Sequence, residues 1–213
     1  TKGISFASAT FDGKLMGMPN ISPGADGVPM LFVRGDWMEE LNLEAPKSIE
    51  DIVNIVEKFK AEKGTTNGLV VSSKIVNKGG NNTYGIDALF ARYNSYPKHF
   101  ITDADGKIVY GSNTAETKNA LQEIRKLVES GVIDSSFVVR DSSTCEELIT
   151  SGQAGVFFGA WWNMSWPLNN MIADDPSVFW NCYLAPLADD GRYNTAMISP
   201  SGSYLVVKAG SSE

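Results

Sequence analysis

Two adjacent tryptophans, Trp161 and Trp162, follow a short apolar run and are the residues best suited to hold a ligand. An indole ring offers a flat apolar face for stacking and one N–H that donates a hydrogen bond. The run from Val156 to Phe158 is typical of a buried strand, and ligands of open α/β sheets collect beyond the carboxyl ends of strands. Adjacent residues point in different directions, so one core cannot bury both rings. Core packing and ligand contact stay open as equal alternatives here.

The sequence lacks the common arrangements of catalytic residues. There is no Gly-x-Ser-x-Gly elbow, no His-Glu-x-x-His helix and no glycine-rich phosphate loop. The sole histidine, His99, has no neighbouring Ser or Cys nucleophile, so we interpret it as structural. Adjacent carboxylates occur at residues 146–147, 174–175 and 189–190. Sequence neighbours cannot usually face each other across a glycosidic bond, so helix ends and turns explain these pairs better. We predict that the protein is not an enzyme.

The chain offers few ligands to a metal ion. Cys145 and Cys182 lie far apart and form no Cys-x-x-Cys pair, so we interpret them as free thiols. The aspartates of residues 103–106 resemble the start of a calcium loop, but position 12 of that loop falls on Thr114 instead of a bidentate Glu. An Asp-Gly hairpin turn is the better interpretation. We predict no metal and no cofactor.

Composition predicts a globular chain with a core of its own. The 213 residues are 43% hydrophobic, which suits one domain or two. The net charge of −7, with Lys and Arg scattered, disfavours nucleic acid and anionic membranes as partners. No stretch approaches the roughly 18 to 20 apolar residues that a membrane span needs. Because the chain begins at Thr1 instead of Met, we expect a mature or excised piece.

Two segments carry strong helix signals. Ser48 is placed to cap a helix over residues 49–61, with Asp51 in a short form of the capping box. A second helix is predicted from Thr114 to a stop at Gly131. Both segments have apolar residues at helical spacing. Shorter helices are predicted over residues 83–93 and 144–150 and in a polar segment after Trp161, and a short helix or turn over residues 36–41.

Strand signals alternate with these helices, which predicts an α/β fold. A hairpin is expected between residues 100 and 110, around Asp105 and Gly106. No internal repeat or low-complexity linker interrupts the pattern. The predicted strands cover residues 14–19, 28–33, 68–72, 154–158, 178–185 and 203–208.

Five segments, in their order and spacing, point to a known family. They are Asp12–Pro19, Asp36–Ser48, Asp105–Gly111, Leu127–Asp134 and Ser151–Trp162. From about residue 12 to its end, the chain resembles extracellular solute-binding proteins of ABC importers. The resemblance is to the sugar-binding branch that includes maltose-binding protein.

The resemblance implies a two-lobed, periplasmic-binding-protein type II-like fold, in which two α/β lobes joined by hinge strands clamp the ligand between them. Residues 1–213 would then be a single excised carboxy-terminal lobe with hinge-proximal segments at both ends, and the amino-terminal lobe would precede Thr1. The two ends of such a lobe should lie close together. Its implied partners are a carbohydrate or oligosaccharide ligand, the permease subunits of an ABC transporter and the missing amino-terminal lobe. The full-length protein would be a monomer, extracellular or periplasmic, and lipid-anchored to the cell membrane.

The resemblance also implies ligand-binding residues. Trp161 resembles the aromatic that stacks on sugar in maltose-binding proteins, with Trp162 as second choice and Asn163 as a side-chain amide for sugar hydroxyls. Tyr84 resembles an aromatic that some members point into the cleft, with Asn82 beside it, although packing at a helix start explains Tyr84 equally well.

Two departures from the family pattern affect the ligand. Met16 stands where an aromatic is common, and the tryptophan doublet is richer than the usual single Trp. The doublet suits a larger or more hydrophobic ligand. Trp37 is predicted to lie in the core, while Trp166 and Trp180 are left unassigned.

Two alternatives remain at this point. A glycan-active enzyme fragment would need two facing carboxylates in the aromatic cleft. A binder of a peptide or another small solute would show no affinity for glycans. On the favoured interpretation the chain alone binds weakly, because a single lobe cannot bury most of the surface of a ligand.

Overall fold

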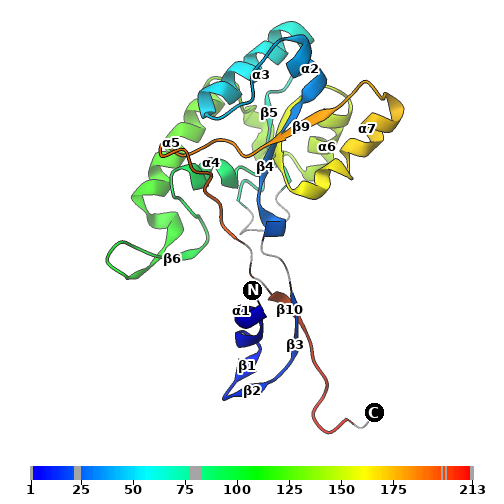
Figure 1. Cartoon of the computed structure of the whole chain (residues 1–213). Coiled ribbons are helices and arrows are strands. Elements are labelled where there is room, and N and C mark those ends of the chain that lie inside the picture. Colours follow the sequence, from blue (N-terminus) through cyan, green and yellow to red (C-terminus); the bar gives the residue numbers. More distant parts are fainter. Residues whose placement is uncertain (1, 22–24, 77–82, 198, 200, 212–213) are drawn as a thin grey trace.

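The computed structural model of the chain describes residues 2–21, 25–76, 83–197, 199 and 201–211. Figure 1 shows two regions, a large one in which helices pack around a sheet and a small one at its foot. We call residues 25–197 the body and residues 2–21 with 201–211 the extension.

The body is built on a mixed four-stranded sheet with the strand order β5-β8-β4-β9. β4 (Met30–Arg34) runs antiparallel to β8 (Val156–Gly159) and to β9 (Trp180–Tyr183). β5 (Leu69–Val70) runs parallel to β8, with Leu69 opposite Val156. The carboxyl ends of β5 and β8 therefore meet at one edge of the sheet. The predicted α/β class is confirmed.

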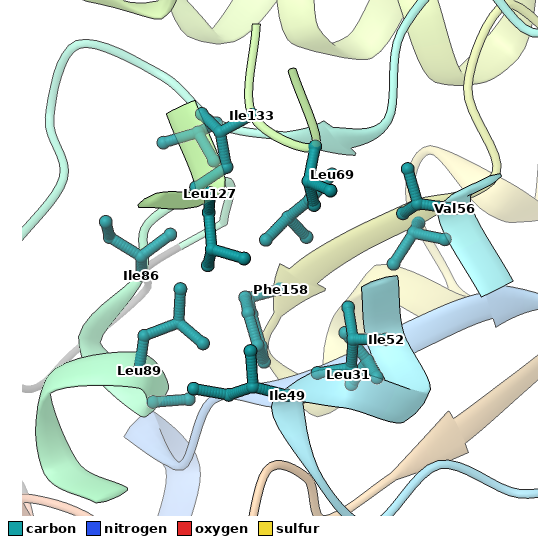
Figure 2. Packing of buried hydrophobic residues seen from close by; sticks show 14 of the residues in the cluster. Leu31, Ile49, Ile52, Val56, Leu69, Ile86, Leu89, Leu127, Ile133 and Phe158 are labelled. Carbon is teal, nitrogen blue, oxygen red and sulfur yellow. The ribbon is translucent and has the colours of Figure 1, made fainter. Parts of the chain in front are cut away.

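Side chains alternate across this sheet, so each face has its own core. Leu31, Leu69 and Phe158 point to one face, where α3 (Ile49–Lys63), α4 (Asp87–Arg92) and α5 (Ala115–Glu129) cover them. Figure 2 shows this first core, where isoleucines and leucines of the helices surround Phe158. The three covering helices come from distant parts of the chain, so the core links most of the sequence.

The opposite face holds a smaller core around Phe32 and Phe157, whose rings stack with centroids 5.0 Å apart. α6 (Ser142–Thr150) and α7 (Leu168–Asp174) cover this face. In Figure 1 they lie on the side of the sheet away from α3 and α5. The buried Cys145 belongs to this core, and Cys145 and Cys182 are both free thiols.

The predicted cap of the first long helix is confirmed. The main-chain N–H of Asp51 donates to Ser48 Oγ at 3.0 Å, and Ser48 N donates to Asp51 Oδ2 at 2.9 Å. α3 ends at Lys63, and Gly64 closes it with φ of 66°. The second long helix, α5, begins next to Thr114 as predicted, and Thr114 Oγ1 accepts from Thr117 N.

The remaining elements of the body are short. The predicted hairpin is present, and its turn is closed by Asp103 Oδ1, which accepts from the main chain of Asp105 and Lys107. The hairpin strands are β6 (Phe100–Thr102) and β7 (Ile108–Tyr110). The other short elements of the body are α2 (Gly35–Glu40) and 3₁₀ turns over Ala25–Gly27, Gly111–Asn113, Ser135–Val139 and Trp161–Met164.

Two helix predictions were partly wrong. The helix expected over residues 83–93 begins only at Asp87, because Tyr84 has φ of 65° and uses its main-chain groups to bond neighbouring strands. The polar helix expected after Trp161 is a 3₁₀ turn, and α7 starts only at Leu168, beyond Pro167. At Tyr84 tertiary hydrogen bonds override the local helical pattern. After Trp161 the proline at position 167 delays the start of the helix.

The extension contains α1 (Lys2–Ala7), the small hairpin β1 (Thr10–Phe11) and β2 (Lys14–Leu15), and an antiparallel pair of β3 (Met18–Ile21) with β10 (Ser201–Leu205). The single strand expected over residues 14–19 is thus divided between β2 and β3. Figure 1 shows β3 and β10 side by side below the body. The stretch of the extension that precedes the body is therefore paired with the stretch that follows it.

Candidate functional site

A cavity of about 330 Å³ opens where β5 and β8 end. Its walls come from the segment after β5, the turn after β8, the residues before α4, and α6. This is the edge at which ligands of α/β sheets collect. The lining residues are Ser72, Lys74, Thr83, Tyr84, Ser142, Glu146, Trp162, Asn163, Trp166 and Pro167.

Tyr84 is held in this cavity by its main chain. Its N–H donates to Phe158 O at 2.7 Å, and its carbonyl accepts from Ser72 N at 2.8 Å, so it joins the ends of β8 and β5. The ring is buried against Phe157, with centroids 5.3 Å apart. Burial raises the pKa of the phenol, and nearby Glu146 raises it further. The hydroxyl, which has no hydrogen-bond partner in the described structure, therefore stays protonated and can donate.

Asn163 holds the turn that carries the tryptophans. Its Oδ1 accepts from Ala160 N at 2.8 Å and from Thr83 Oγ1 at 3.1 Å, and its Nδ2 donates to Trp166 O at 3.1 Å. The residue is fully buried. A Cβ on Gly159 would lie 2.4 Å from Asn163 Oδ1, so only glycine fits at the end of β8. With these bonds in place, Asn163 positions the aromatic walls of the cavity.

The tryptophans take different places. Trp162 is half-buried and lines the cavity, as does Trp166, which is 52% exposed. Trp161 is 56% exposed and does not line it. Trp37 packs edge-on against Phe59 beside the first core, where the sequence predicted it. Trp180 lies in the second core.

The structure thus brings three of the five predicted site residues, Trp162, Asn163 and Tyr84, to one cavity. It places Trp161 beside them, outside the lining. Asn82 falls outside the described residues.

Two charged lining residues were missed by sequence reasoning. Glu146 was interpreted as part of a pair at a helix end, but it lies within α6, one turn after Ser142, and faces the cavity. The spacing of four residues was a usable signal, because positions i and i+4 share a helix face. Lys74 follows β5 in a segment without any recognisable motif, so only the strand-end rule pointed to it.

The described residues contain no cluster of three or more His, Cys, Asp or Glu side chains placed to hold a metal ion. Across the described part of the chain, no helix combines the length and apolar character needed to cross a bilayer.

A second cavity, of about 300 Å³, lies in the extension and is almost wholly apolar. Phe11, Met16 and Val206 line it, together with the ring of Tyr204. Around it the extension exposes many large apolar side chains, namely Ile4, Phe11, Leu15, Met16, Met18, Ile21, Leu205, Val206 and Val207.

No protein-family profile matches the chain. Three proteins resemble it in sequence at 26% identity. The polygalacturonan/rhamnogalacturonan-binding protein YtcQ of Bacillus subtilis matches over 159 residues, 71% of this chain and 30% of that protein. The fructooligosaccharide ABC transporter substrate-binding protein FusA of Streptococcus pneumoniae matches over 175 residues, 78% of this chain and 31% of that protein. Lipoprotein LipO of Bacillus subtilis matches over 132 residues, 59% of this chain and 25% of that protein.

Solved structures share the fold of the chain. The alginate-binding protein AlgQ2 superposes with a TM-score of 0.67 at 16% identity, over 98% of this chain and 43% of that one. FusA in complex with kestose superposes with a TM-score of 0.66 at 21% identity, over 99% of this chain and 43% of that one. The resemblance to sugar-binding proteins of ABC transporters is confirmed, and the fold is that of part of a solute-binding protein. The chain spans about 30% of the length of YtcQ and FusA.

Proposed function

We propose that this chain is the ligand-binding, carboxy-terminal lobe of an extracellular solute-binding protein that delivers a carbohydrate or oligosaccharide to an ABC importer. The observation that carries the proposal is the cavity beyond β5 and β8, where Trp162 and Trp166 line the same space as Tyr84 and the polar Thr83. A pyranose ring has an apolar face that suits indole and a rim of hydroxyls that need directional partners. YtcQ, FusA and AlgQ2, which are named for binding polysaccharides or oligosaccharides, support this ligand class.

The composition of the cavity favours binding over catalysis. Glycosidases place two carboxyl groups on opposite sides of the scissile bond. Among the described lining residues only Glu146 carries a carboxylate. The carboxylate of Glu146 can accept hydrogen bonds from sugar hydroxyls. The described lining holds no second carboxyl group of the kind that hydrolysis needs. The related YtcQ and FusA are likewise named as binding proteins.

The apolar surface of the extension supports an amino-terminal lobe as the missing partner. Isolated proteins seldom expose large continuous apolar patches. Here the exposed side chains and the apolar cavity of the extension surround the paired strands β3 and β10. A second lobe that packs against this surface would cover it and would supply the facing wall of the ligand site. Permease subunits, a location outside the cell membrane and a lipid anchor complete the proposal, and one relative is named as a lipoprotein.

Calorimetry on the full polypeptide that carries this chain tests the proposal, with a panel of neutral and acidic oligosaccharides. We expect at least one of them to bind at micromolar concentration or better. Trp162→Ala should weaken that binding about tenfold or more, because a stacked aromatic is lost. Phe100→Ala, in the exposed hairpin away from the cavity, is the matched control and should change the affinity less than twofold.

Two results would overturn the proposal. Binding of peptides or another solute with no heat from any glycan would remove the ligand class. Release of shorter sugars from a bound oligosaccharide would remove the non-catalytic role. The 213-residue chain by itself should bind the same glycan at least a hundredfold more weakly, because most of the ligand surface stays in water. Equal affinity in the isolated chain would contradict the two-lobed site.

A further inference from the structure

Lys74 brings an uncompensated positive charge to the cavity. Its ammonium group makes no ion pair or hydrogen bond within the described residues, whereas Lys60 and Lys98 donate to carbonyls, and Lys63 and Lys126 pair with glutamates. The charge is therefore free for a ligand.

The main chain fixes the position from which Lys74 reaches the cavity. Lys74 N donates to Ser72 Oγ at 3.3 Å, and Ser73 N donates to Arg140 O at 2.8 Å. Ser72 itself bonds the carbonyl of Tyr84. The main chain of Lys74 thus stands on a segment tied to the end of β5 and to Tyr84, which fixes the point from which its side chain reaches the cavity.

The surrounding protein charges leave Lys74 without a partner. Glu146, the other charged lining residue, forms no ion pair with it. Arg140, whose main chain touches the same segment, is paired with Asp134 at 3.2 Å. The cavity therefore presents a cation and an anion as separate groups, next to the rings of Trp162 and Trp166.

A uronate sugar matches all of these groups at once. Its carboxylate accepts from the ammonium of Lys74, and charge-assisted hydrogen bonds are about twice as strong as neutral ones. Its hydroxyls donate to the acceptor-only carboxylate of Glu146. Its apolar face stacks on indole. A neutral sugar leaves Lys74 without an anionic partner, and an amino sugar meets it with a like charge.

We propose that the cavity selects an acidic oligosaccharide with uronate carboxylates, and that Lys74 is the residue that makes this selection. The inference rests on the proposed function, since it concerns the ligand of the same cavity.

Two ligands that share a sugar backbone but differ in charge test the role of Lys74. Oligogalacturonate and its methyl ester have the same sugar backbone, but the ester lacks the negative charge. On the full polypeptide at low salt, calorimetry should show the acid binding about tenfold or more tightly than the ester. Lys74→Gln should weaken the acid about tenfold and change the ester less than twofold. Lys74→Arg, which keeps the charge, should restore most of the preference.

Lys118→Gln removes a lysine from α5, outside the cavity, and serves as the control for net charge. It should leave both affinities within twofold. Added salt should reduce the preference for the acid, because screening weakens exposed charge pairs. Equal affinity for the two ligands, or no effect of Lys74→Gln on the acid, would overturn the selection by Lys74 while the proposed function stands. Absence of binding to every saccharide would remove both.

Discussion

The body and the extension use apolar side chains in opposite ways. In the body, Phe158 and Leu31 are fully buried between a sheet and helices. In the extension, Met18 and Leu205 occupy paired strands, yet Leu205 is 75% exposed. The same residue types thus stabilise one region by leaving water and cannot do so in the other. This exposed surface is the one that we propose packs against an amino-terminal lobe.

The bonds that hold the extension together fit this view. β3 and β10 pair with an irregularity between Ser201 and Tyr204, and Tyr204 Oη donates to Ser8 Oγ at 2.9 Å. A two-stranded pair without a covered face is marginally stable in water. The body should therefore unfold as the cooperative unit, while the extension contributes little to that transition.

The largest expected effect comes from the core of the body. Phe158→Ala should lower the free energy of unfolding by about 3–5 kcal/mol, because it removes a fully buried ring and leaves a cavity. Phe100→Ala, the same change at a site 75% exposed, should cost less than about 1 kcal/mol. Urea unfolding followed by far-UV circular dichroism measures both. Equal losses for the two variants would contradict the assigned core.

The same Gly→Ala change should cost different amounts of stability in the body and in the extension. Gly159→Ala should cost about 1–3 kcal/mol and disturb the tryptophan turn, since the new Cβ meets Asn163 Oδ1 at 2.4 Å. Gly202→Ala, in β10, meets no atom within 4 Å and should be neutral within about 0.5 kcal/mol. Thermal unfolding and tryptophan fluorescence report stability and the turn. A Gly159→Ala variant with unchanged stability and fluorescence would contradict this, because it would show that Asn163 can move away from the new methyl group.

The cap of α3 gives an intermediate effect. Ser48→Ala should destabilise the body by about 1 kcal/mol, because Asp51 N loses its acceptor at the start of the helix. Ser48→Asn, which keeps an acceptor, should recover most of the loss. Denaturant midpoints measure the difference. A Ser48→Asn variant as unstable as Ser48→Ala would assign the loss to something other than the cap.

A smaller effect depends on pH. Hydrogen bonds from the main chain of Lys47 and Ser48 lower the pKa of Asp51 below its ordinary value. Its stabilising contribution is therefore complete above the unfolded pKa of about 3.9 and is lost as the pH falls through the lower folded-state pKa. Asp51→Asn should cost about 0.5 kcal/mol at pH 7, and the difference should disappear once the pH falls below the folded-state pKa. A constant difference across this range in denaturant titrations would rule out a role of the charge.

Local signals predicted the parts of the fold that short-range interactions decide. The cap at Ser48, the helix start at Thr114 and the turn at Asp103 depend on hydrogen bonds that span two to four residues, so a short stretch of sequence is enough to predict them. The strand-end rule likewise placed Trp162 in the candidate site, because β8 was recognisable as an apolar run.

Long-range contacts decide the parts that were missed. Tyr84 leaves the helical pattern because Phe158 and Ser72, distant in sequence, bond its main chain. Lys74 enters the site only because β5 pairs with β8, which no local pattern encodes. Sequence spacing likewise does not show which tryptophan lines the cavity, since the turn that carries Trp161 and Trp162 is held through the distant Thr83, which donates to Asn163.

The smallest loss of stability in this chain is expected for a change at Leu205, and the same change should cost more in the full polypeptide. Leu205→Ala should change the stability of the 213-residue chain by less than about 0.5 kcal/mol, since the side chain already lies largely in water. If a second lobe covers the extension, the same change in the full polypeptide should cost about 2 kcal/mol or more. Tyr110→Ala, partly exposed in the hairpin of the body, is the control and should cost the same in both forms. A Leu205→Ala variant that is equally mild in both would show that the extension stays uncovered, and the contrast between the two regions would then belong to the whole protein.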